Sequence, residues 1–149
     1  MDTKYYQYQK GRINMRRISI IITTALLMIT GMNSAHAEQL DAAAVKALYN
    51  DQTINAFNLV KDIESTTYYN PNGKFYGTRD DSIFQGEWEV KDDGNICLTF
   101  ANGKTRCRLM QKVDGTYYKY KVKGNGKLKR LLEYKSFTKG NPNNFKWSD

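Results

Sequence analysis

Basic side chains alternate with apolar ones over the last third of the chain, and their spacing suggests a site for an anion. If Asp114-Gly115 is a two-residue hairpin turn and residues 124–126 form a loop, the basic residues of three neighbouring strands share one sheet face. Like charges that lie opposite each other destabilise a sheet, so we predict that this outward face binds an anion. The alternative is that the lysines only blunt sheet edges and aid solubility. The predicted face comprises Arg106, Arg108, Lys119, Lys121, Lys123, Lys127 and Lys129.

The same strand alignment places aromatic residues on the opposite face, which we expect to point inward. Tyr118 and Tyr120 then lie beside Leu109, and Arg130 lies opposite Tyr120. The simplest interpretation is that these tyrosines belong to the core. The alternative is a pocket for a small amphipathic ligand, lined by Trp88, Tyr118, Tyr120 and Arg130, in which Arg130 holds the acidic end of the ligand.

Side chains for most enzyme chemistry are missing. The single histidine, His36, lies in an N-terminal segment that we expect to be removed, which excludes histidine triads and histidine-bound metals from the mature chain. The sequence has no Cys-x-x-Cys pair, P-loop or dinucleotide fingerprint. Glu87 and Glu89 share one strand face about 6.5–7 Å apart, which would suit a glycosidase pair, but we expect that face to be in water. We therefore predict a non-enzymatic protein with no cofactor and no metal.

The two cysteines, Cys97 and Cys107, are predicted to form a disulfide. A three-residue loop at 92–94 aligns Trp88 with Leu98, but the register of the next hairpin is open. With Asn102-Gly103 as a two-residue turn, one face is uniformly apolar and the cysteines point to opposite faces. With a three-residue loop at 101–103, the cysteines lie opposite each other and the apolar residues lie opposite arginines.

Magnitudes favour the apolar register of this hairpin. Exposing Ile96, Leu98 and Phe100 would forfeit about 1.5–3 kcal/mol each, whereas the disulfide contributes roughly 2.5–3 kcal/mol. We therefore expect the apolar register, with either a β-bulge near Cys97 or helix cover of the outer face, so that the disulfide still forms.

Local patterns predict one short helix followed by strands. Asp41 can cap a helix over residues 41–50, whose apolar side carries Val45 and Leu48. Turn residues then recur every 8–12 positions, as in an all-β barrel or sandwich. We predict a small antiparallel meander barrel with one N-terminal helix, in a single domain over residues 38–149. Its strands are expected near 53–60, 65–70, 74–79, 84–90, 95–101, 104–112, 116–123 and 127–138.

The first 37 residues resemble an export signal. Arg16-Arg17 precede an apolar run over residues 18–30, and Ala35-His36-Ala37 suits cleavage after Ala37. We expect Met15 to be the true start and residues 1–37 to be an extension plus a signal peptide. The apolar run is shorter than the ~20 residues that span a bilayer, so we expect no transmembrane segment in the mature chain and a periplasmic or secreted location.

Charge is unevenly distributed along the expected mature chain. Residues 38–103 hold 5 Lys/Arg and 11 Asp/Glu, whereas residues 104–139 hold 12 and 2. A basic segment usually suggests nucleic acid, but export argues against that partner. We expect an exported binding protein that engages an anionic lipid, a lipopolysaccharide or an acidic protein through its basic face, or alternatively carries a small amphipathic ligand inside the barrel.

Several short motifs together resemble a known family. They are Tyr68-Tyr69-Asn70-Pro71-Asn72-Gly73 with Gly77, then Gly86-Glu87-Trp88, Asp93-Gly94 with Cys97, Cys107, and Gly140-Asn141-Pro142. In this order they resemble the proteobacterial secreted family named domain of unknown function 995, over nearly the whole mature chain. The resemblance implies a small exported β domain and no particular activity. Gly86-x-Trp88 also resembles the lipocalin signature, which implies a lipocalin-like barrel, but here three expected strands precede it.

Overall fold

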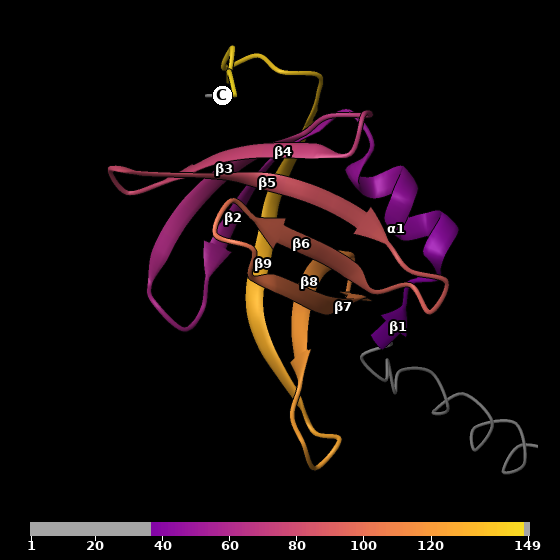
Figure 1. Ribbon diagram of the computed structural model, residues 1–149. Helices are drawn as coiled ribbons and strands as arrows, with labels where there is room; N and C mark the ends of the chain where they lie inside the picture. The colour runs from indigo at the N-terminus through magenta and orange to yellow at the C-terminus, as the bar shows by residue number, and fades with distance from the viewer. Residues whose placement is uncertain (1–36, 148–149) are drawn as a thin grey trace, which may run out of the picture. The chain divides into compact units, whose positions relative to one another are not determined.

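The computed structural model describes residues 37–147, which form a β-barrel with one short helix (Figure 1). The strands lie within two residues of the predicted bounds, and β1 is an addition to them. The elements are β1 (Ala37–Gln39), α1 (Ala42–Tyr49), β2 (Gln52–Asn58), β3 (Ile63–Tyr69), β4 (Lys74–Arg79), β5 (Ser82–Val90), β6 (Ile96–Phe100), β7 (Thr105–Val113), β8 (Thr116–Val122) and β9 (Leu128–Lys139).

The eight strands β2 to β9 close into an antiparallel barrel. Each strand pairs with the next one along the chain, and β9 pairs back with β2. The predicted all-β meander barrel with an N-terminal helix is therefore confirmed. β1 adds to the side of β7, where Ala37 lies opposite Val113.

The meander sorts the connections between two ends of the barrel. The links after β2, β4, β6 and β8 lie at one end, which we call the open end. The links after β3, β5 and β7 lie at the other end together with α1, which leads directly into β2, and we call this the helix end. Residues from α1 reach the core only from the helix end.

Helix α1 is capped as predicted and anchors the core at the helix end. The Asp41 side chain accepts a hydrogen bond from the Ala44 N–H at 2.7 Å. Val45 and Tyr49 are fully buried, while Leu48 is only partly buried. The Tyr49 ring meets the Tyr69 ring edge-on, with 4.7 Å between centroids. Such an eight-residue helix gains most of its stability from this burial.

The core continues from Tyr49 through aromatic and apolar residues of the barrel wall. Phe75, Ile54, Ile96 and Met110 are fully or almost fully buried. Trp88 is also buried, and its indole N–H donates to the Asn70 carbonyl at 2.9 Å. These apolar side chains fill the interior of the barrel at the helix end. The interior at the open end is lined by a different set of residues.

The C-terminal tail lies along the outer side of β3 and β4. The Trp147 indole N–H donates to the Phe75 carbonyl at 3.2 Å, and its ring lies 6.2 Å from that of Tyr68. Phe145 lies 5.1 Å from the Tyr76 ring. This cover gives tyrosines on the outer face a partly apolar environment.

The register of the β6–β7 hairpin differs from the one we expected. Cys97 lies opposite Cys107 and is disulfide-bonded to it, so the disulfide is confirmed. The loop takes three residues, and Leu98 lies opposite Arg106 while Trp88 faces Leu98 as predicted. The expected apolar register is wrong, and the disulfide needs neither a bulge near Cys97 nor helix cover.

A physical reason for this register is that the apolar residues do not become exposed. Ile96 is fully buried, and Leu98 and Phe100 are partly buried on the inside of the barrel. Instead, Arg106 and Arg108 share that inner face with them. The free energies compared in the sequence analysis assumed that this register would expose Ile96, Leu98 and Phe100, and that exposure does not occur.

No helix among residues 37–147 is long and apolar enough to cross a membrane. The expected start at Met15 and the expected signal peptide over residues 1–37 lie outside the residues that the structure describes, except for Ala37, which begins β1.

Candidate functional site

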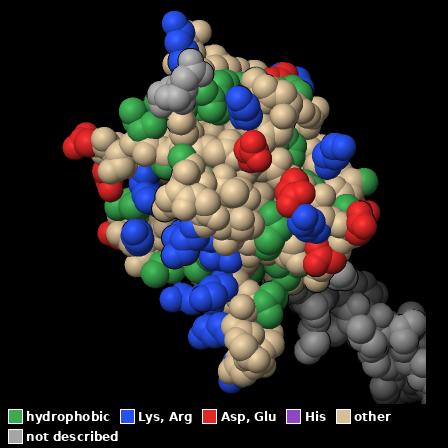
Figure 2. Space-filling view, in the orientation of Figure 1, with side chains coloured by type: hydrophobic (Ala, Val, Ile, Leu, Met, Phe, Trp, Pro, Cys, Tyr) green, Lys and Arg blue, Asp and Glu red, His purple; other side chains and the backbone are tan. Residues whose placement is uncertain are grey.

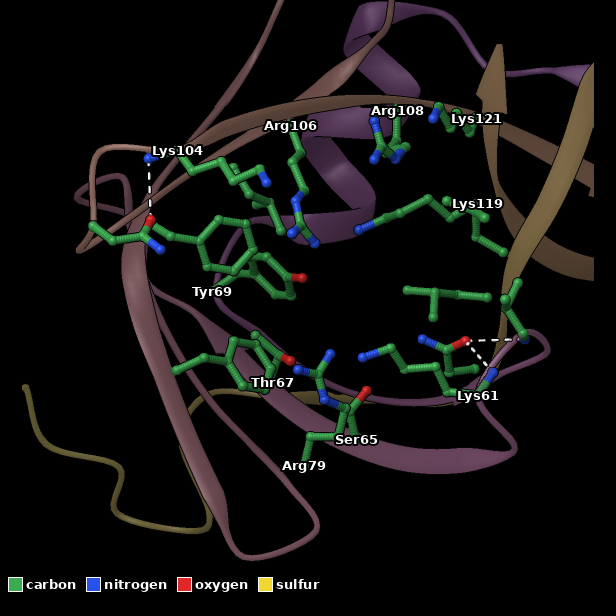
Figure 3. Close-up of a pocket in the computed structure, with 18 residues that line it drawn as sticks. Lys61, Ser65, Thr67, Tyr69, Arg79, Lys104, Arg106, Arg108, Lys119 and Lys121 are labelled. Carbon is green, nitrogen blue, oxygen red and sulfur yellow. Dashed lines mark hydrogen bonds between the residues drawn. The ribbon is translucent and has the colours of Figure 1, made fainter. Parts of the chain in front are cut away.

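A cavity of about 430 Å³ opens between the barrel walls at the open end (Figure 3). Its lining combines an apolar wall with seven cationic side chains. Among the described residues that line it, none is Asp or Glu. The apolar wall includes Tyr69, Phe84, Leu98, Phe100, Leu131 and Leu132. The cations are Lys61, Arg79, Lys104, Arg106, Arg108, Lys119 and Lys121.

Strand periodicity brings four of these cations to one wall. Side chains two residues apart share a face, so Arg106 and Arg108 of β7 point inward together. Met110 of β7 pairs with Lys119 of β8, which places Lys119 and Lys121 on the same inner face. Figure 3 shows Lys61 and Arg79 extending from the opposite wall. Positive charge therefore surrounds the cavity on more than one side.

Lys119 is the most deeply buried of the cations. Its side chain is 4% exposed, and its Nζ lies 5.3 Å from the Tyr49 ring centroid and 5.7 Å from that of Tyr134. The salt bridges among the described residues do not include it. Burial, and then the charge of Arg108, lower the pKa of Lys119 to about 7. The two aromatic faces stabilise the ammonium, but no carboxylate of residues 37–147 forms a salt bridge with it.

The two rings below Lys119 are linked to each other. The hydroxyls of Tyr49 and Tyr134 share a hydrogen bond, and burial raises the pKa of both. Both tyrosines therefore stay neutral around neutral pH. The Lys119 amine, which lines the cavity, thus lies against a pair of neutral aromatic rings.

Aromatic rings also support the arginines of the cavity wall. The Arg106 guanidinium lies 5.3 Å from the Phe100 ring, and that of Arg79 lies 5.6 Å from the Phe84 ring. Gly77 makes room for Phe84, because a Cβ at residue 77 would lie 2.5 Å from that ring. Guanidinium groups over aromatic faces keep their N–H groups free for an anion.

Burial and the neighbouring Arg106 lower the pKa of Arg108. Its Nη1 donates to the Cys107 carbonyl at 2.6 Å. An anion in the cavity would relieve the repulsion between the two guanidinium groups. The arrangement suits a carboxylate, phosphate or sulfonate, because guanidinium groups bind these anions with paired N–H donors.

The predicted ligand pocket of Trp88, Tyr118, Tyr120 and Arg130 is wrong. Trp88 lies inside the barrel at the helix end, while the other three residues lie on the outer face of β8 and β9. The Arg130 guanidinium lies 3.9 Å from the Tyr118 ring centroid, and its Nε donates to the Tyr120 hydroxyl at 3.1 Å. A one-residue change of register turns every side chain of a strand to the other face, and the β6–β7 hairpin made this change for β7 to β9.

The same change divides the predicted outward basic face. Arg106, Arg108, Lys119 and Lys121 line the cavity, so their predicted outward orientation is wrong. Lys123, Lys127 and Lys129 are exposed on the β8–β9 hairpin beyond the cavity. The predicted pairing of Lys121 with Lys129 is confirmed.

Sequence reasoning missed three lining cations, Lys61, Arg79 and Lys104. A usable signal exists, because each lies in or beside a link after β2, β4 or β6. Alternate links of a meander meet at one end of a barrel, so their charges meet there too.

The carboxylates and cysteines form no second site among the described residues. Glu89, one of the two strand glutamates, pairs with Lys91 at 2.6 Å on exposed side chains. Within residues 37–147, no three His, Cys, Asp or Glu side chains gather as they would around a metal ion.

No protein-family model matches this chain, and the search of curated proteins finds no match to it either. The resemblance to the family of unknown function stays a prediction.

Proposed function

We propose that this protein binds a small amphipathic anion inside its barrel, at the open end. The observation that carries the proposal is a cavity with seven cations and an apolar wall, and with no carboxylate among its described lining residues. Lys119 is buried, and Arg79 and Arg108 are half-buried. A buried positive charge without a partner is costly, so a site of this kind favours an anionic occupant. Its volume of about 430 Å³ lies in the usual range for small-molecule sites.

The proposed ligand has a charged head and an apolar tail. Phosphate or carboxylate oxygens would accept hydrogen bonds from Arg106, Arg108 and Lys119, while the tail would contact Phe84 and Phe100. A lipid or lipid fragment with a phosphate or carboxylate has this chemistry. The proposed activity is binding and carriage, without catalysis.

We place the protein in the periplasm or outside the cell. The Cys97–Cys107 disulfide supports this, because such bonds persist in oxidising compartments. The predicted signal peptide supports the same location.

Displacement of a fluorescent anion tests the proposal. The probe 1-anilinonaphthalene-8-sulfonate is bound to the folded protein, and octyl phosphate or octanol is added as competitor. We expect octyl phosphate to displace the probe at far lower concentration than octanol, since the two share a tail and differ in charge. Equal potency of the two competitors would contradict the proposal.

A pair of matched double variants locates the binding site. Arg106→Gln with Arg108→Gln removes two cavity cations, and we expect octyl phosphate affinity to fall at least tenfold, because a hydrogen bond to a charged group contributes about 1.5–3 kcal/mol. Lys123→Gln with Lys127→Gln removes the same charge outside the cavity and should change the affinity much less. Similar losses in both would indicate general electrostatic attraction. Urea unfolding checks that both variants are folded.

A further inference from the structure

The β8–β9 hairpin carries an unusual surface at the open end of the barrel. Val122 and Leu128 lie opposite each other and are 54% and 42% exposed. Lysines flank this apolar pair on both strands: Lys121, Lys123, Lys127 and Lys129. Figure 1 shows the hairpin projecting past the rest of the barrel, and Figure 2 shows Lys and Arg side chains gathered at its base.

Two backbone hydrogen bonds close the hairpin tip. The Lys123 N–H donates to the Lys127 carbonyl at 2.9 Å, and the Gly126 N–H donates back to Lys123 at 2.9 Å. Gly126 has a φ of 76°, which this turn requires. This hydrogen-bonded turn joins the strand ends that carry the exposed pair Val122 and Leu128.

The β2–β3 link extends this surface. Leu59 and Val60 are 41% and 52% exposed, and the Leu59 N–H donates to the Leu131 carbonyl of β9 at 2.9 Å. The link therefore lies beside the hairpin. We call this surface the docking rim. It consists of Leu59, Val60, Lys61, Lys121, Val122, Lys123, Lys127, Leu128 and Lys129.

We propose that the docking rim seats the protein on an anionic phospholipid bilayer, with Val122, Leu128, Leu59 and Val60 entering the headgroup layer. The hairpin carries its apolar pair on one face and its lysines on the other, because neighbouring residues of a strand point to opposite faces. Together they match the apolar and anionic components of such a surface, and clusters of four or more lysines bind anionic lipid. A projecting hairpin tip offers little of the flat area of about 800 Å² per partner that a protein interface needs, whereas a bilayer surrounds an inserted tip.

The charge of the other rim loops sets the tilt on the bilayer. The β4–β5 turn carries Asp80 and Asp81, which an anionic surface repels, although the neighbouring Ile83 is 65% exposed. The protein therefore leans toward the β8–β9 side. This inference does not rest on the proposed cavity ligand, because Leu59, Val122 and Leu128 do not line the cavity, although Val60, Lys61 and Lys121 belong both to the docking rim and to the cavity lining.

Vesicle co-sedimentation tests the docking rim. Vesicles of phosphatidylcholine alone are compared with an equimolar mixture of phosphatidylcholine and phosphatidylglycerol. We expect binding to the anionic vesicles only. Lys123→Gln with Lys127→Gln should weaken it about 25-fold, at about fivefold per lysine near the surface. The control pair Lys46→Gln with Lys74→Gln, exposed at the helix end, removes the same charge and should have little effect.

Insertion is measured separately with V122W. We expect its fluorescence to shift to shorter wavelength on anionic vesicles and to stay unchanged on neutral ones. Failure of the lysine pair to weaken binding more than the control pair would overturn the proposal. So would binding to soluble polyglutamate as tight as to vesicles, without the fluorescence shift, since that would indicate an acidic protein partner. Octyl phosphate displacement is measured on the same variants. Because it reports on the cavity and co-sedimentation reports on the docking rim, either proposal can fail without the other.

Discussion

Replacing Lys119 by methionine should stabilise this protein, and the gain should depend on pH in a defined way. The ammonium of Lys119 is buried beside Arg108 and rests on two tyrosine rings, with no carboxylate partner among the described residues. Methionine fills a similar volume without charge. The variant therefore removes the cost of the buried charge while still filling the space of the Lys119 side chain.

The structure sets the size of this effect. The pKa of Lys119 falls from 10.5 to about 7 on folding. Each pKa unit corresponds to about 1.4 kcal/mol, so the charge costs up to roughly 4–5 kcal/mol where it must be protonated. Because the folded pKa is the lower one, the unfolded chain binds the proton more tightly between about pH 7 and 10.5. Wild-type stability therefore rises with pH across that window and the cost is fully present below it.

Urea unfolding of wild type and Lys119→Met, repeated across the pH range, measures this difference. We expect the variant to be more stable by several kcal/mol below pH 7 and the advantage to shrink by up to about 1.4 kcal/mol per pH unit above it. Lys123→Met, on the exposed hairpin, removes the same charge outside the core and is the control. A stability difference that is constant from pH 6 to pH 10 would refute the assignment of Lys119 as an unpaired buried cation.

Three other substitutions test the fold. Replacing Cys97 and Cys107 by alanine should lower the free energy of unfolding by roughly 2.5–3 kcal/mol in urea titrations, and an unchanged value would mean that the disulfide does not constrain the unfolded chain. Asp41→Ala should cost about 1 kcal/mol through loss of the helix cap, which circular dichroism during thermal unfolding can measure. Gly86→Ala should cost more than about 3 kcal/mol, because its Cβ would lie 2.0 Å from the Thr99 carbonyl oxygen. A soluble, native-like alanine variant would contradict that geometry.

Turn chemistry made the strand order predictable. Gly73, Gly94, Gly115 and Gly126 all adopt positive φ in turns that the sequence identifies. Such turns act through local backbone preferences, so they can be located without knowing the tertiary structure. The cap at Asp41 was predictable for the same reason.

The lining of the site was not predictable, because it depends on the length of one loop. Asn102-Gly103 is a typical two-residue turn, yet the loop also includes Ala101, with Gly103 at a φ of 77°. That single residue decides whether Arg106 and Arg108 face inward. A comparison of burial energies could not decide it either, since it assumed a dry barrel interior, and the arginines occupy an open cavity.

The link from β6 to β7 also has a consequence for how the chain matures. The sequence is compatible with two alignments of this hairpin, one with a uniformly apolar face and one with arginines beside Leu98. Only the second brings Cys97 opposite Cys107. Oxidation within the hairpin therefore traps one alignment and removes the other from the folding ensemble. A chain that has formed the Cys97–Cys107 disulfide therefore has Arg106 and Arg108 on the inner face of the barrel.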